Sequence, residues 1–161
     1  MKRKLAALFL HPYFLSILTL LMLVLFYSSI KVTWFFLHPA NHFQEAVELW
    51  EGFGTILLGL GVFLEERPAL QHILGLDPVR ARKEEEDAVE AVCHDYGVIF
   101  VIFGVIIELF AWLVKIPNEV LDTYGIEFTF LNVAALAATF SAVLQIKFFF
   151  EILAAHFKRR K

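Results

Sequence analysis

Acidic side chains interrupt the apolar segments of this chain at positions where they could bind a cation or a proton. Glu51 and Glu65 stand near the two ends of the stretch WEGFGTILLGLGVFLEE, and Glu108 lies inside a second apolar stretch. Carboxylates within a membrane are costly, so they usually face protein, water or a partner. Two carboxylates close together favour binding of a proton or a cation, because their charges repel.

The two stretches share a pattern at an offset of 43 positions: a polar residue, then two glycines, then a glutamate. The offset aligns Glu51, Gly54, Gly61 and Glu65 with His94, Gly97, Gly104 and Glu108. The marked positions recur at heptad-like spacing and therefore share one helix face. Glycines on such a face allow two helix backbones to approach closely in lipid. The match is explained either by an internal repeat or by chance similarity of glycine-rich apolar sequence.

Antiparallel pairing of these two helices predicts which polar residues share a depth. Glu51 falls near Glu108 at the outer end, and Glu65 falls near His94 and Asp95 at the inner end. The outer pair would form an acidic site, and the inner group would form a mouth where His94 titrates near neutral pH. The alternative is that both outer acids are ordinary helix-end residues of a tilted protein.

Long apolar blocks set the fold class. Of the 161 residues, 59% are hydrophobic, above the 45–50% of soluble domains. Each block offers at least about 19 residues, enough to cross about 30 Å of hydrocarbon. We therefore expect an all-α membrane protein, a single four-helix transmembrane domain over residues 1–161. The predicted spans are 12–37, 44–66, 88–115 and 128–157, with a loop over 67–87.

Basic residues predict the direction of the spans. Lysine and arginine cluster before the first span, between the second and third, and after the fourth, whereas the other two connections have none. By the positive-inside rule, both termini and the 67–87 loop are cytoplasmic, and the bundle is antiparallel, up-down-up-down. Trp34, Trp50 and Trp112 would then lie at the outer interface, where indoles favour the headgroups. Pro12 would open the first helix after His11.

Other polar residues within the spans are possible charge or hydrogen-bond partners. Lys31 could compensate one of the outer acids or extend to the interface, and Lys147 could pair with Glu151 or Glu65. Polar residues of the fourth span, Ser141 and Gln145 among them, are expected to form hydrogen bonds between helices.

These features favour a small, non-enzymatic, multi-pass protein of an inner or plasma membrane. The leading hypothesis is a homo-oligomer with cation or proton permeation along the second and third spans. The alternative is an accessory or scaffold subunit that binds a partner membrane protein. A third hypothesis is haem binding through two of His11, His94 and His156, or metal binding through Glu51, Glu108 and Glu48. The single cysteine excludes an intramolecular disulfide. No phosphate-binding or nucleic-acid motif is present, and we expect no cofactor.

Overall fold

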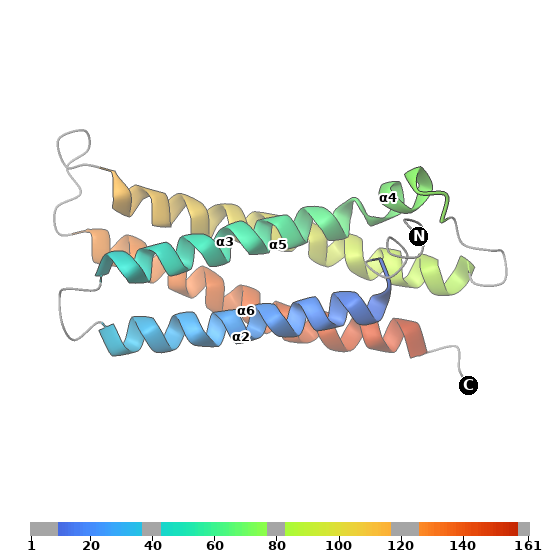
Figure 1. The fold of residues 1–161 in the computed structure, drawn as a ribbon, viewed down its shortest axis with the longest axis horizontal. Coiled ribbons are helices and arrows are strands. Elements are labelled where there is room, and N and C mark those ends of the chain that lie inside the picture. The colour runs from blue at the N-terminus through green and yellow to red at the C-terminus, as the bar shows by residue number, and fades with distance from the viewer. Residues whose placement is uncertain (1–9, 37–42, 77–82, 117–125, 158–161) are drawn as a thin grey trace.

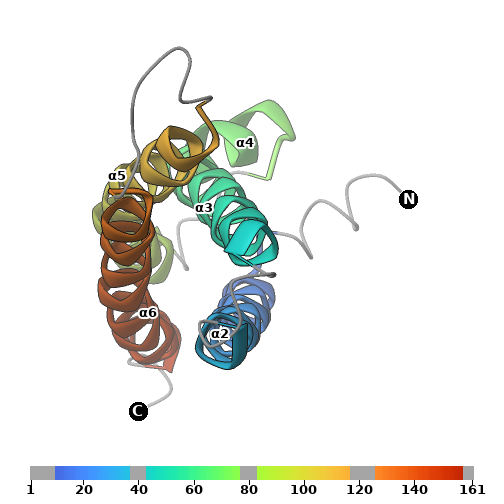
Figure 2. The same cartoon turned by 90° about the vertical axis from the view of Figure 1, so that its left-hand side faces the viewer.

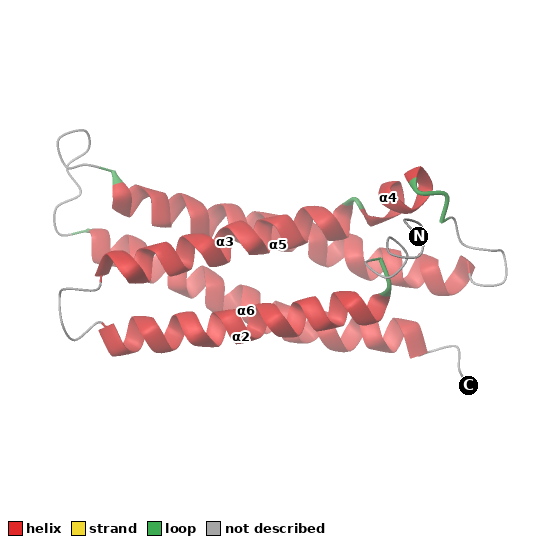
Figure 3. Cartoon of the chain, viewed as in Figure 1, coloured by secondary structure: helices red, strands yellow, loops and turns green. Residues whose placement is uncertain are grey.

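The computed structural model describes residues 10–36, 43–76, 83–116 and 126–157. Within these ranges every regular element is a helix (Figure 3). The helices are α2 (Pro12–Phe36), α3 (Phe43–Glu65), α4 (Arg67–Ile73), α5 (Lys83–Lys115) and α6 (Glu127–Phe157).

The four long helices lie side by side in a bundle (Figures 1 and 2). The contact between α3 and α5 is the most extensive, followed by that between α5 and α6, and α2 packs on both α6 and α3. The beginnings of α2 and α5, the ends of α3 and α6, and α4 all lie at one end of the bundle (Figure 1). We call this the α4 end, and the other the far end.

Four of these helices are long and apolar enough to cross a membrane. The qualifying segments are Pro12–Lys31, Phe43–Glu65, Glu86–Lys115 and Glu127–Phe157. They overlap the four predicted spans, and they fit a small multi-pass membrane protein. Helix α5 begins before this segment, at Lys83, and residues 83–85 are charged.

Helix ends follow local chemistry. Pro12 is the first residue of α2, as predicted, and the His11 carbonyl oxygen accepts from the amides of Phe14 and Leu15 at 2.9 and 3.2 Å. The chain leaves α4 through Gly75, whose φ of 63° favours glycine. Such capping matters here because helix-end amides and carbonyls otherwise lack partners.

One tryptophan of the predicted outer interface is covered by the bundle. Trp50 is 1% exposed and packs against Phe26 and Phe53, with ring centroids 6.1 and 6.2 Å away. It is buried because it shares the inward face of α3 with Phe53 and Leu57, at offsets of three and seven residues. Trp112 is exposed. The side chain of Trp34 lies outside the described residues.

Candidate functional site

The closest backbone approach between helices is that of α3 and α5, and glycines create it. A Cβ atom built on Gly61 would lie 2.6 Å from the Val101 amide nitrogen and 2.7 Å from the Gly97 carbonyl oxygen. A Cβ atom on Gly104 would lie 2.7 Å from the Leu58 amide nitrogen. Gly54 and Gly97 are also in close contact with the opposite helix. All four glycines of the shared pattern therefore lie in this contact.

This packing places a line of polar side chains along the outer edge of the α3–α5 contact. We call this line the polar seam. It consists of Glu51, Thr55, Glu108 and Lys115 toward the far end, and Glu65 and His94 toward the α4 end. Glu51, near the start of α3, contacts Lys115 at the end of α5, whereas Glu65, at the end of α3, contacts His94, earlier in α5. The two helices therefore run in opposite directions.

At the far end, each of the two acids has its own partner. The Lys115 ammonium forms an ion pair with Glu51, and each of these side chains is about a third exposed, at 32% and 31%. The Thr55 hydroxyl donates a hydrogen bond to Glu108 Oε1, and it also lies 3.1 Å from the Glu51 carbonyl oxygen. The structure thus separates the two acids into an ion pair and a hydroxyl–carboxylate pair. Thr55 and Lys115 were not among the predicted site residues.

At the α4 end, His94 Nδ1 lies 2.8 Å from Glu65 Oε1. The His94 side chain is 65% exposed and that of Glu65 is 34% exposed, so this pair is open to its surroundings. Asp95 is exposed too, but among the described residues no contact joins it to the pair. Adjacent residues of an α-helix point about 100° apart, which turns Asp95 away from the seam.

Glu108 is the unusual member of the polar seam. It is half-buried, and among the described residues its polar partner is the hydroxyl of Thr55, with no cationic side chain beside it. It lies seven residues before the end of α5, which is about 10 Å by helical rise. A carboxylate at that depth requires a proton, a cation or a basic partner to lower its cost in lipid.

The polar seam faces out of the bundle. Exposed apolar side chains flank it, Val62 on α3 and Val105, Leu109 and Trp112 on α5. A surface of this composition is apolar enough for lipid, yet it carries a carboxylate in its middle. Its polar groups are therefore accessible to a neighbouring transmembrane helix.

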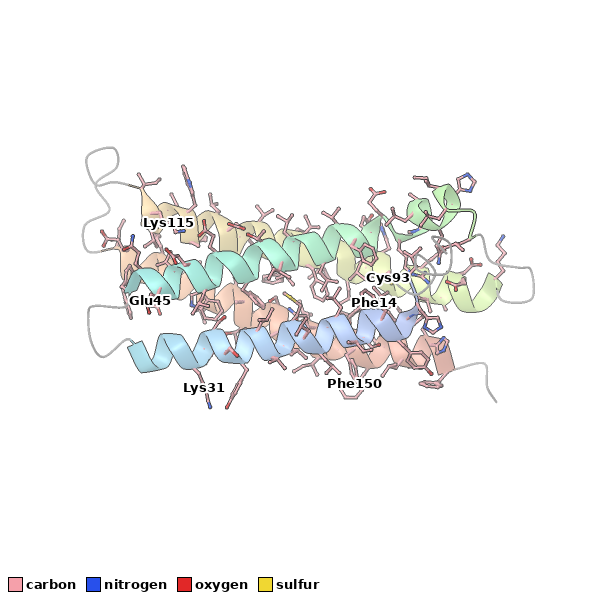
Figure 4. The ribbon with its side chains drawn as sticks, viewed as in Figure 1. Phe14, Lys31, Glu45, Cys93, Lys115 and Phe150 are labelled. Carbon is pink, nitrogen blue, oxygen red and sulfur yellow. The ribbon has the colours of Figure 1, made fainter. Side chains whose placement is uncertain are left out.

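The two lysines of the other spans do not reach the polar seam. The Lys31 ammonium lies 5.0 Å from the centre of the Tyr27 ring on its own helix, and it points away from α3 and α5 (Figure 4). Lys147 pairs with Glu151 at 3.5 Å, and both side chains are exposed, at 65% and 42%. That pair lies on the outer surface of α6 and not inside the bundle.

Sequence reasoning missed a buried arginine at the α4 end. Arg67 was read as one of the charges of the loop, but it is 1% exposed. Its guanidinium donates to the Leu10 carbonyl oxygen at 3.1 Å and to Glu86 Oε2 at 2.8 Å. It therefore joins the start of α2 to α4 and α5. No sequence signal marks it, because its burial depends on three segments that meet only in the folded chain.

Within the described residues, Ser141 and Gln145 of α6 do not form the expected bonds between helices. Ser141 donates to the Ala138 carbonyl oxygen of its own helix at 2.8 Å. Gln145 is fully buried, and neither its amide nitrogen nor its amide oxygen has a hydrogen-bond partner within the described part of the chain. A buried hydroxyl can satisfy itself on a preceding carbonyl of its own helix, as Ser141 does.

Histidines and acids do not form a metal-binding cluster within the described residues. No group of three or more histidine, cysteine, aspartate or glutamate side chains is close enough there to hold a metal ion. His11 and His156 are neighbours, but their rings contact each other edge to face with centroids 5.5 Å apart.

Comparisons with protein-family models, curated proteins and solved structures find no match.

Proposed function

We propose that this protein is a non-enzymatic subunit of a membrane assembly, and that the polar seam of α3 and α5 is the surface by which it recognises a neighbouring transmembrane helix. The observation that carries the proposal is Glu108. Its carboxylate lies about 10 Å inside the span, faces outward, and has a threonine hydroxyl as its described polar partner. A partner that supplies hydrogen bonds or a positive charge would remove most of its cost in lipid.

The pairing of the other seam residues favours recognition of a partner helix, and it argues against an acidic site shared by Glu51 and Glu108. Lys115 already neutralises Glu51, so the second carboxylate of the expected outer pair is not available to hold a cation with Glu108. The glycines that allow close packing are used within the chain, and among the described residues Glu108 is the seam carboxylate that has no cationic partner. In this proposal both termini and the α4 end are cytoplasmic, as the basic residues predict.

Cation or proton permeation is the second candidate. The specific observation in its favour is again Glu108, because an outward-facing carboxylate inside a span, with no basic partner among the described residues, marks a candidate ion path. A path would then run along the polar seam from Glu51 and Glu108 toward Glu65 and His94. Such a path lies on the outside of the bundle, so several copies would have to surround it.

The proposal is tested by measuring the size of the assembly. Protein extracted from its membranes in mild detergent is weighed by native mass spectrometry, as wild type, Glu108→Gln and Glu151→Gln. We expect Glu108→Gln to weaken association about tenfold, the size of an interhelical polar contact worth roughly 1–2 kcal/mol. Glu151→Gln is the matched control, because Glu151 lies on α6 outside the polar seam and has its partner, Lys147, within the chain. Monomeric wild-type protein, or equal effects of both variants, would contradict the proposal.

The second candidate is tested with the same variants in liposomes. Cation and proton flux that is abolished by Glu108→Gln, with the fold intact, would favour permeation. Well-folded assemblies that carry no flux would eliminate it and leave recognition as the function.

A further inference from the structure

We infer that the partner of the polar seam is a second copy of this chain, and that Lys31 of that copy pairs with Glu108. This inference rests on the proposed function and names the partner of the same surface. It follows from charge complementarity. Among the described residues, Glu108 has no cationic partner, and the Lys31 ammonium lies against the Tyr27 ring with no carboxylate beside it.

The two residues lie at similar depth. Lys31 is five residues before the end of α2 at Phe36, and Glu108 is seven residues before the end of α5 at Lys115. By helical rise these offsets are about 7 Å and about 10 Å from the far end. Copies that share one membrane and one orientation keep these depths, so Lys31 of one copy meets Glu108 of the next at nearly one level.

The surface around Lys31 matches the surface around Glu108. On α2, the exposed side chains of Leu20, Val24 and Tyr27 form one stripe with Lys31, at helical offsets of four, three and four residues. On α5, the exposed Val98 and Val105 precede Glu108. Both helices begin at the α4 end (Figure 1), so they pack in parallel across two copies. The apolar stripes then align over the same turns when Lys31 meets Glu108.

The contact joins two different surfaces. Lys31 points away from α3 and α5 (Figure 4), so it cannot reach Glu108 of its own chain. A contact between unlike surfaces is heterologous and repeats from copy to copy, closing into a ring when the rotation allows. Each copy in the assembly contributes one lysine and one glutamate, and neither charge remains alone in lipid.

Charge reversal tests the pairing. Lys31→Glu and Glu108→Lys each place like charges at the contact, so each variant alone should lose self-association at least about tenfold. A mixture of the two should regain it. The first variant carries an acid at both positions and the second carries a base at both, so every contact in an alternating assembly again joins an acid to a base. Monomer folding is checked by circular dichroism, and Glu151→Gln is the control, because Glu151 is an exposed acid of α6 outside the polar seam.

Cross-linking tests the geometry without charge reversal. In a background with Cys93→Ala, Lys31→Cys and Glu108→Cys are made in separate chains and oxidised together in the membrane. We expect a disulfide-linked dimer in the mixture and much less of it from either variant alone. Val143→Cys, exposed on α6, replaces Lys31→Cys as the control partner.

The outcomes separate this inference from the proposed function. Stable assemblies that show neither rescue nor the mixed disulfide would overturn the Lys31–Glu108 contact and leave helix recognition standing. A disulfide-linked dimer from Glu108→Cys alone would show a symmetric contact and would also overturn the Lys31–Glu108 contact. Cross-linking of the polar seam to a basic residue of a different protein would overturn it too. Wild-type chains that remain monomeric in membranes, with no partner bound, would refute both.

Discussion

Replacing Gly61 with alanine should push α3 and α5 apart, and the size of the resulting loss of stability follows from the contacts of the new Cβ atom. The new Cβ atom would lie 2.6 Å from the Val101 amide nitrogen and 2.7 Å from the Gly97 carbonyl oxygen. Both are backbone atoms, so the helices themselves must shift. Overpacking of this kind costs about 1–3 kcal/mol, while alanine returns up to about 1 kcal/mol of helix propensity. We expect Gly61→Ala to destabilise the fold by about 2 kcal/mol.

The assay is a denaturant titration of the detergent-dispersed protein, followed by circular dichroism. Gly59→Ala is the matched control, two residues away on the same helix, because a Cβ atom on Gly59 would meet nothing within 4 Å. It should leave stability unchanged or raise it by up to about 1 kcal/mol. Equal midpoints for Gly61→Ala and Gly59→Ala would refute the argument that these backbones are in close contact.

Three further predictions concern buried groups. Arg67→Met should destabilise the fold by about 3 kcal/mol, because it leaves Glu86 without its cation. A double-mutant cycle with Glu86→Gln should show strong coupling between the two residues, and additive effects would contradict this. Gln145→Met should stabilise the fold by about 1–3 kcal/mol in the same titration, because it removes an amide with no partner among the described residues, and a loss of stability would show that the amide is satisfied. Cys93 is fully buried, so a water-soluble maleimide should label it only on unfolding, and rapid labelling of the folded protein would be inconsistent with the packing of α5.

Sequence reasoning was most effective for features that depend on one helix at a time. The four apolar helices follow from the length of uninterrupted apolar sequence, and Pro12 marks the start of α2. The glycines of α3 and α5 were singled out by spacing, since residues at heptad offsets must share a face. That face lies in the α3–α5 contact, with Gly61 and Gly97 against each other.

The partners of individual side chains were decided by the tertiary structure. Helical spacing fixes depth along the bundle, but it does not fix which way a helix is rotated or how far a side chain reaches across. The sequence therefore predicted Glu51 and Glu108 at similar depth. In the folded chain Glu51 forms an ion pair with Lys115, and Glu108 accepts a hydrogen bond from Thr55.

The sequence by itself determined an all-helical chain with four apolar helices, because backbone groups in lipid must be satisfied within each segment. Only the tertiary structure decided what is inside. It buried Trp50 and Arg67, which composition places at an interface and in a loop, because neighbouring helices cover them. It also turned the polar seam outward, because the apolar faces of α3 and α5 occupy the core and leave their remaining edge at the surface.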